Sequence, residues 1–211
     1  MKITAIGSCR LIRPLKLLEE QKLITFNNAG FFNYLHTLSE IIKHINVLKK
    51  NDSYKLKLAE LQLGNKNSRL FPPKVFNLKE SNLIICEVSS IKNFIYEKQN
   101  LQINHFKRFV CKQSKTENIY ELLWNKNSYP YLNTNKIEKF ESLPNLSKDI
   151  LKKTVLIKDD HSSFLKKIFE LLSLIDIPII FTTHFDFIEK GKSISERHEL
   201  IEWLRNYSYK N

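Results

Sequence analysis

Ile3-Thr4-Ala5-Ile6-Gly7-Ser8-Cys9-Arg10 is the stretch that decides the expected fold, because an apolar run ends in a glycine and three chemically active residues. The first four residues predict a short buried strand. Gly7 allows a sharp turn and a close approach of the following N–H groups to a ligand. In open α/β sheets, ligands bind beyond the carboxyl ends of the strands. The turn therefore predicts a site with two potential nucleophiles, Ser8 and Cys9, and a fixed cation, Arg10.

Apolar runs and amphipathic stretches alternate along the rest of the chain. The predicted strands cover residues 82–88, 154–157 and 177–183, and the predicted helices cover residues 11–20, 31–48, 164–174 and 195–206. Such alternation is typical of a parallel sheet with helices on both faces. The sequence therefore predicts the α/β class.

The segment from about 97 to 153 interrupts this alternation. It is rich in Lys, Asn, Ser and Tyr and shows only patchy helical spacing. We expect a single domain over residues 1–211 in which this segment is an insertion that forms a lid or a substrate-facing wall. A surface elaboration with no role in binding is the alternative at this stage.

Each predicted strand ends in a polar cluster. The clusters are Gly7-Ser8-Cys9-Arg10, Ser89-Ser90, Asp159-Asp160-His161 and His184-Phe185-Asp186. One such cluster means little, since loops are usually polar. Four clusters at the same edge of one parallel sheet would converge on a single cleft, which is where we expect the chemistry.

The residues of these clusters suit acyl transfer or ester hydrolysis, which need a nucleophile, a base and oxyanion donors. Cys9 is the better nucleophile, because a thiol loses its proton more easily than a hydroxyl and a helix N-terminus lowers the pKa of a thiol further. Ser8 is the alternative. The candidate bases are His184 and His161, and a carboxylate of Asp186, or of the pair Asp159 and Asp160, would orient them.

Backbone and hydroxyl groups near the turn are candidate oxyanion or substrate-binding groups. They are the turn at Gly7, the N–H groups of Cys9 and Gly30, and the hydroxyls of Ser89 and Ser90. Arg10 and Lys92 would bind an anionic part of a substrate, although surface ion pairing is the common role of a single basic residue. The remaining histidines are expected to be surface or packing residues, His36 and His44 on the long helix and His105 and His198 in polar surroundings.

Composition excludes several classes of protein. The chain of 211 residues carries a net charge of +12, but most of the positive charge is scattered lysine, with no recognition-helix or RNP-like motif, which argues against nucleic-acid binding. No apolar run is long enough to span a bilayer, and the first apolar run is too short for a signal peptide, so we expect a soluble, cytoplasmic protein. Three cysteines without metal-ligand spacing argue against a disulfide framework or a zinc ribbon.

The turn resembles a known family. Ile6-Gly7-Ser8-Cys9-Arg10 after an opening strand is similar to the first block of the SGNH/GDSL superfamily, whose motif is Gly-Asp-Ser. It is most similar to the GSCFA-type and WcbI-type branches, the latter linked to capsule polysaccharide biosynthesis, in which a Gly-x-Cys turn takes that place. Aligning the glycines puts Ser8 at the family Asp and Cys9 at the family nucleophile. Further similarity lies in the helix after Asn28-Ala29-Gly30, in Glu87-Val88-Ser89-Ser90-x-Lys92 and in Arg197-x-x-Leu200-Ile201.

The resemblance covers most of the chain outside 97–153. It implies a flavodoxin-like three-layer fold and an esterase or acyltransferase that acts on a glycan, with no required cofactor and with acyl-CoA as a possible donor. Two other classes stay open. One is a sugar or nucleotide-sugar binding module of polysaccharide biosynthesis without catalysis. The other is a metal-dependent phosphoesterase built on Asp159, Asp160, His161, His184 and Asp186, whose spacing matches no metal motif.

Overall fold

The structure is a computed structural model that describes residues 1–27, 35–49, 56–58, 61–62, 78–114, 142–183 and 195–208. The chain divides into two compact units. The first consists of Met1–Ser53, Arg69–Ile91 and Asp159–Asn211, and the second of Tyr54–Ser68 and Lys92–Lys158. The predicted insertion at 97–153 falls within the second unit. The expectation of one domain with a lid stays a prediction.

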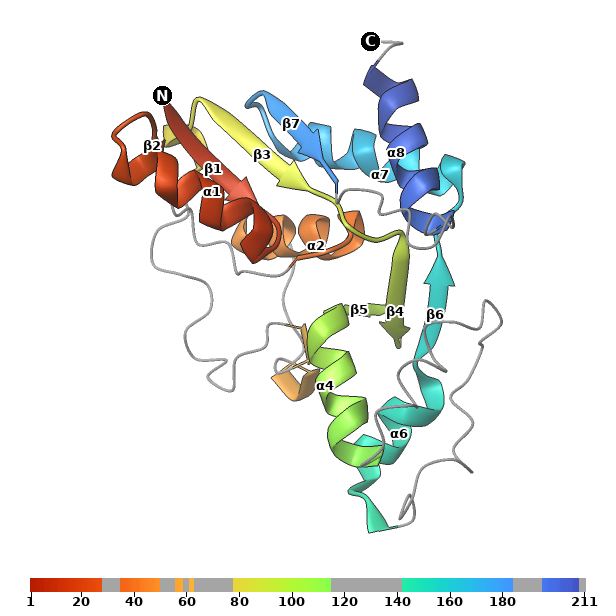
Figure 1. The fold of residues 1–211 in the computed structure, drawn as a ribbon. Helices are drawn as coiled ribbons and strands as arrows, with labels where there is room; N and C mark the ends of the chain where they lie inside the picture. Colours follow the sequence, from red (N-terminus) through yellow and green to blue (C-terminus); the bar gives the residue numbers. More distant parts are fainter. Residues whose placement is uncertain are drawn as a thin grey trace, which may run out of the picture. The chain divides into compact units, whose positions relative to one another are not determined.

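A four-stranded parallel sheet forms the centre of the first unit (Figure 1). The strands are β1 (Lys2–Ile6), β2 (Thr25–Phe26), β3 (Leu83–Glu87) and β7 (Ile179–Thr182), in the order β2-β1-β3-β7. Ile6 pairs with Cys86, and Cys86 pairs with Phe181, so β1, β3 and β7 end at one edge. The predicted α/β class is confirmed, and this shared end is called the carboxyl edge below.

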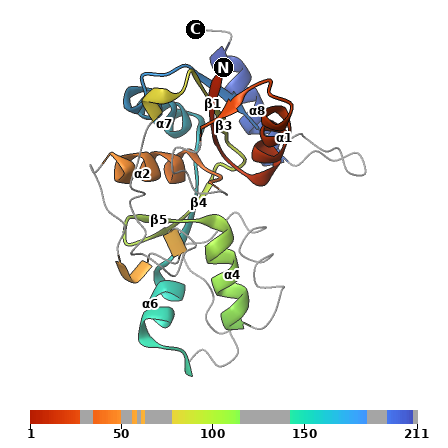
Figure 2. The same cartoon turned by 90° about the vertical axis from the view of Figure 1, so that its left-hand side faces the viewer.

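Helices cover both faces of this sheet. They are α1 (Cys9–Glu20), α2 (Leu38–Leu48), α7 (His161–Leu174) and α8 (Ser195–Ser208). Figure 2 shows α2 and α7 on one side of the strands and α1 on the other. Ile84 and Cys86 of β3 are fully buried in a core that includes Ile41 of α2 and Ile168 of α7. The apolar side chains of α2 recur at helical spacing, so one face of the helix packs against the sheet.

Three helices begin at other residues than predicted, among them α7, which begins at His161 and not at residue 164. The helix expected over 31–48 begins at Leu38, because Thr37 and Glu40 form a capping box, and residues 31–34 lie outside the described residues. The helix expected from residue 11 begins at Cys9, so Pro14 lies in the second turn and not in the first. A proline there has no N–H for the carbonyl four residues earlier.

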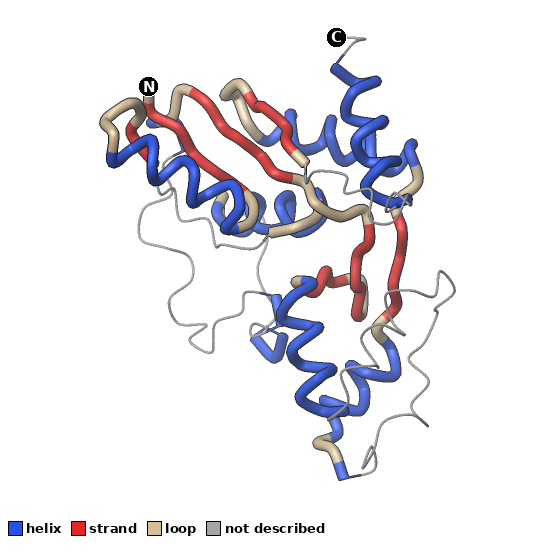
Figure 3. Tube along the Cα trace, viewed as in Figure 1, coloured by secondary structure: helices blue, strands red, loops and turns tan. Residues whose placement is uncertain are grey.

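The second unit is built on a three-stranded antiparallel sheet (Figure 3). Its strands are β4 (Lys92–Tyr96), β5 (Gln99–Leu101) and β6 (Val155–Lys158), in the order β5-β4-β6. The helices α4 (Ile103–Ser114) and α6 (Asn145–Lys153) contribute to its core, which also includes Phe94 and Phe106 with ring centroids 4.7 Å apart. The prediction that 154–157 is a strand of the parallel sheet is therefore wrong. An apolar run predicts a strand but does not show its partner.

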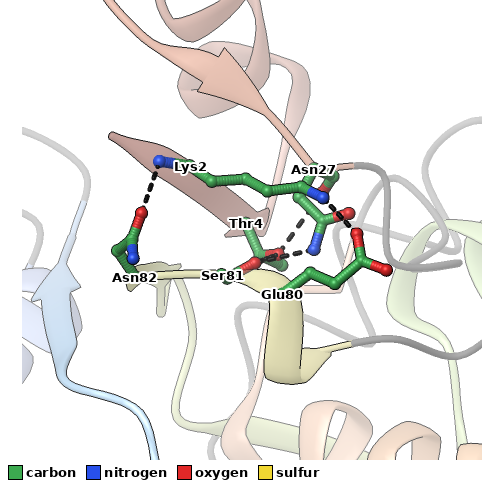
Figure 4. A network of polar contacts seen from close by, with 6 residues as sticks. All are labelled: Lys2, Thr4, Asn27, Glu80, Ser81 and Asn82. Atoms are coloured by element: carbon green, nitrogen blue, oxygen red, sulfur yellow. Dashed lines mark hydrogen bonds and ion pairs between the residues drawn. The ribbon is translucent and has the colours of Figure 1, made fainter.

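A polar network fixes the amino end of the parallel sheet (Figure 4). Thr4 Oγ1 and Ser81 Oγ share a buried hydrogen bond of 2.6 Å, and Asn27 Nδ2 donates to the same Ser81 hydroxyl at 2.7 Å. The Lys2 N–H donates to Asn82 Oδ1 at 2.8 Å, and the Lys2 ammonium pairs with the carboxylate of Glu80 in the short 3-10 helix Leu78–Glu80. The network ties β1 to the segment that enters β3.

Within the described part of the chain, no helix combines the length and the apolar character needed to cross a bilayer. The first unit presents a sheet edge where three strands end together, and the candidate site is built there.

Candidate active site

The predicted nucleophile turn lies where β1 passes into α1. Ser8 is the N-cap of α1, it is 4% exposed, and its hydroxyl accepts the N–H of Arg10 at 3.2 Å. The capping role occupies the hydroxyl of one predicted nucleophile. Cys9 is the first residue of the helix, and Arg10 beside it is exposed. The assignment of Cys9 as the nucleophile stays a prediction.

A buried carboxylate lies directly against this turn. The Ser8 N–H donates to Glu87 Oε2 at 2.6 Å, and Glu87, the last residue of β3, is 4% exposed. Gly7 has φ 155°, and a Cβ atom on it would lie 2.6 Å from Glu87 Cβ and 2.8 Å from Glu87 Oε2. Glycine is therefore required at position 7, because any side chain would push the turn away from the carboxylate.

His36, which the sequence did not assign to the site, lies beside the chain that follows β3. The N–H groups of Ser89 and Ser90 both donate to the carbonyl oxygen of His36, at 2.9 Å and 3.0 Å. His36 Nδ1 lies 2.7 Å from Ser89 Oγ, and the His36 N–H donates to Glu40 Oε2 at 2.6 Å. The prediction that His36 lies on the long helix is wrong, since it precedes the N-cap Thr37. Ser89, predicted as an oxyanion donor, has its hydroxyl on this imidazole. His44 is on the helix as expected and is fully buried.

The end of β7 joins the same edge. The N–H of Val88 donates to the carbonyl oxygen of Thr182 at 2.8 Å, so the chain leaving β3 runs beside the last residue of β7. Thr183 follows, and its buried hydroxyl has no hydrogen-bond partner in the described part of the chain. His184, Asp186 and Gly30, which the sequence assigned to the site, lie outside the described residues.

The strand that precedes the cluster Asp159-Asp160-His161 is not the one predicted. The cluster follows β6, which belongs to the antiparallel sheet, and not a fourth strand of the parallel sheet. The Asp159 N–H donates to the carbonyl oxygen of Ile91, so the cluster still lies beside the chain that leaves β3.

The side chains of this cluster have mainly structural partners. Both carboxylate oxygens of Asp159 bind the Lys167 ammonium, at 2.6 Å and 2.7 Å. Asp160 caps α7 through the N–H of Ser163 at 2.7 Å. The exposed His161 begins the helix, with its ring centroid 5.5 Å from that of Trp203.

Two further predictions concern Lys92 as an anion-binding residue and a metal site. Lys92, expected to bind an anion, is 2% exposed as the first residue of β4 in the second unit. Among the described residues, no three His, Cys, Asp or Glu side chains are arranged to hold a metal ion. Since His184 and Asp186 lie outside that part of the chain, the metal-dependent alternative stays an untested prediction.

Three helices begin beside the chain that leaves β3. The N-termini of α1, α2 and α7, capped by Ser8, Thr37 and Asp160, are each tied by hydrogen bonds at or beside the chain leaving β3. A helix N-terminus carries a partial positive charge that favours an anion or a developing oxyanion. The His36 imidazole, 2.7 Å from Ser89 Oγ, lies beside the same chain.

Sequence reasoning missed His36 and gave Glu87 no role of its own. A signal for His36 was present, because Thr37-Leu38-Ser39-Glu40 has the spacing of a capping box and places the residue before it outside the helix. No comparable signal marks Glu87, since an acidic residue at a strand end is common on the surface of loops.

Comparison with known proteins gives one match. Residues 1–209 match the family model of the TviD N-terminal domain. The model describes an N-terminal domain of a Vi capsule polysaccharide biosynthesis protein. The chain matches no curated protein and no solved structure at a significant level. The match confirms the predicted link to capsule polysaccharide biosynthesis and gives no support to the SGNH/GDSL resemblance.

Proposed function

The chain belongs to the TviD N-terminal domain family, and on that premise we propose that it is an acyltransferase or esterase of polysaccharide biosynthesis. The substrate is a glycan or a polysaccharide precursor with an anionic part. The three-layer arrangement of the first unit suits the SGNH-like, flavodoxin-like fold that the Gly-x-Cys turn implies. Cys9 is the nucleophile.

One observation carries the proposal: the turn that holds Cys9 is built against a buried carboxylate. The bond from the Ser8 N–H to Glu87 and the missing side chain at Gly7 fix the first turn of α1 at the carboxyl edge. Glu87 also ends the strand whose next residues hold the His36 imidazole. A turn fixed in this way keeps a nucleophile in one position through the reaction.

The reaction follows from these groups. The Cys9 thiol gives its proton to an imidazole, and the thiolate attacks the carbonyl carbon of the acyl donor. A C–S bond forms, the bond to the leaving oxygen or sulfur breaks, and the leaving group takes the proton from the imidazolium. A sugar hydroxyl or water then attacks the thioester, gives its proton to the imidazole and releases the thiolate, which is reprotonated.

The substrate contacts are assigned from exposure and charge. Arg10 is exposed at the first turn of α1 and would bind an anionic group of the donor or the glycan. The N–H of Cys9, in the first helical turn, would donate to the oxyanion. No cofactor is required, and acyl-CoA is the donor if the reaction is a transfer in the cytoplasm. Lys92 and the residues outside the described part of the chain keep the roles that the sequence predicted for them.

Turnover of acyl esters and acyl-CoA donors by the purified chain, with glycan acceptors, tests the proposal. We expect activity that Cys9→Ala abolishes, with a loss on the order of 10³-fold or more because no other group forms the thioester. Cys111→Ala on α4 is the control and should retain activity. Full activity in the Cys9→Ala variant would overturn the proposal. So would a co-crystal that holds an intact sugar at the carboxyl edge of a protein without turnover, since that result identifies a binding module.

A further inference from the structure

His36 is fixed at its backbone and at its ring. Its carbonyl oxygen accepts two N–H groups, from Ser89 and Ser90, and its own N–H donates to the Glu40 carboxylate at 2.6 Å. Its Nδ1 lies 2.7 Å from Ser89 Oγ, which is the hydrogen-bond range for an oriented catalytic imidazole. Three of these contacts fix the backbone, and the contact with Ser89 Oγ orients the ring. The residue as a whole is half-buried.

The same hydrogen bonds place His36 at the edge that holds the nucleophile turn. Ser89 lies two residues after Glu87, and Glu87 accepts the N–H of Ser8, the residue before Cys9. Val88 between them is fixed to β7 through Thr182. The segment from Glu87 to Ser89 is therefore held by β1 on one side, β7 on another and His36 at its end.

We propose that His36 is the proton acceptor of this edge and that Ser89 is the positioning residue for its ring. The proposal rests on the acyl chemistry proposed above and names the imidazole that this chemistry needs. In this role the ring has the tautomer in which Nδ1–H donates to the Ser89 hydroxyl and Nε2 carries the lone pair. Nε2 takes the proton of the Cys9 thiol, and the imidazolium returns that proton to the leaving group.

The charged groups around this imidazole define its electrostatic setting. Glu40 of α2 lies at the His36 backbone, Glu87 of β3 lies two residues before Ser89, and Arg10 of α1 is exposed at the nucleophile turn.

Substitution by asparagine separates the proposed role from a structural one. The amide of Asn at position 36 occupies the place of Cγ and Nδ1, so His36→Asn can keep the hydrogen bond to Ser89 while it removes Nε2. The backbone bonds to Ser89, Ser90 and Glu40 are unaffected by the side chain. Ser89→Ala removes the positioning hydroxyl, and Ser89→Thr restores it. His198→Gln, on an exposed histidine of α8, is the matched control.

The reaction of Cys9 with iodoacetamide across pH, located by peptide mass spectrometry, is the readout that does not require turnover. Cys86 is an internal reference, because burial raises the pKa of its thiol to about 12 and keeps it unreactive. We expect His36→Asn to slow Cys9 alkylation at pH 7 by about tenfold or more and to move its pH dependence upward, since the thiolate loses its cationic partner. Ser89→Ala should give a smaller loss of about 2- to 15-fold, the size of one hydrogen bond, and Ser89→Thr should recover most of it.

Turnover then separates the two proposals. In an active enzyme, His36→Asn should lower kcat by about 100-fold or more and change the acidic limb of the pH–rate profile, while the control stays near wild type. Wild-type alkylation and turnover in both His36→Asn and Ser89→Ala overturn the role of His36 and leave the function of Cys9 intact. A protein without turnover in which His36→Asn still slows alkylation keeps the thiol–imidazole pair and rejects acyl transfer. If His36→Asn does not fold, the Ser89 pair decides by the same readout.

Discussion

The two ends of the parallel sheet carry polar residues of the same types but arrange them differently. At the amino end, Thr4, Asn27 and Ser81 bond to one another in a closed network, and Lys2 pairs with Glu80 (Figure 4). At the carboxyl end, hydrogen bonds lie at the starts of helices: the N–H of Ser8, the cap of α1, donates to Glu87, and the N–H of His36, just before the cap of α2, donates to Glu40.

The difference shows how polar groups are used at each end. Mutual hydrogen bonds among short side chains satisfy each other and hold strands together. Hydrogen bonds at the starts of helices instead hold those N-termini and an imidazole in one geometry, which is the condition for a preorganised site. We therefore assign the amino end to stability and the carboxyl end to function, and the substitutions below test that division.

Gly7→Ala should have the largest effect. A methyl group there would lie 2.6 Å from Glu87 Cβ, and the backbone φ of 155° is unfavourable for alanine. We expect a loss of about 3 kcal/mol in the free energy of unfolding, measured in urea, together with a disturbed turn at Cys9. Ser8→Ala, which removes only the capping hydroxyl, should cost about 1 kcal/mol. Equal effects of the two variants would show that Gly7 does not pack on Glu87.

Glu87→Gln should have the next largest effect. The amide oxygen can still accept the Ser8 N–H, but the buried bond at 2.6 Å loses its charge. We expect a loss of about 1–2 kcal/mol in unfolding free energy and a change in the rate of Cys9 alkylation. A stability loss with unchanged Cys9 reactivity would assign Glu87 to the fold alone.

Ser81→Ala tests the amino end. It removes the hydroxyl that both Thr4 and Asn27 contact, so the buried Thr4 hydroxyl and the partly buried Asn27 amide each lose a partner. We expect a loss of about 1 kcal/mol in unfolding free energy, with alkylation of Cys9 and any turnover at the wild-type level. A clear fall in Cys9 reactivity would contradict the division between the two ends.

Glu80→Gln should have the smallest effect. It removes the partner of Lys2 from a pair in which both side chains are partly exposed, and such pairs contribute about 0.5 kcal/mol or less. The difference from wild type should shrink further as salt is added, because exposed charges are screened. A salt-independent loss of unfolding free energy as large as that of Glu87→Gln would show that the carboxylates of Glu80 and Glu87 contribute equally to stability.

The sequence predicted strands of the parallel sheet where an apolar run ends in a turn residue or a polar cluster. Gly7 after β1 and Ser89 after β3 are such positions, and the strands there were predicted correctly. The run before Asp159 had the same pattern, but its partner in the sheet depends on contacts far away in the sequence, and it pairs with β4. The hairpin from β4 to β5 was missed because Glu97 and Lys98 turn with φ of 47° and 61°, without the glycine or asparagine that usually marks this turn.

The candidate site was predicted in part for related reasons. The turn at Cys9 was visible, because glycine and thiol have a chemical meaning in sequence alone. His36 was hidden because the helical spacing of Phe31, Tyr34 and Leu38 extended the predicted helix past the capping box. Its contact with Ser89 joins residues 53 positions apart, which no local pattern records.

The most direct test of the different roles of the two ends is to expose the protein briefly to an acyl-CoA donor at neutral pH. Mass spectrometry of its peptides then shows which residue carries the acyl group. We predict acylation of Cys9 that Cys9→Ala abolishes, His36→Asn reduces and Ser81→Ala leaves unchanged. A protein that carries no acyl group on Cys9, or that is labelled equally at surface lysines, would contradict the assignment of the carboxyl edge to acyl chemistry.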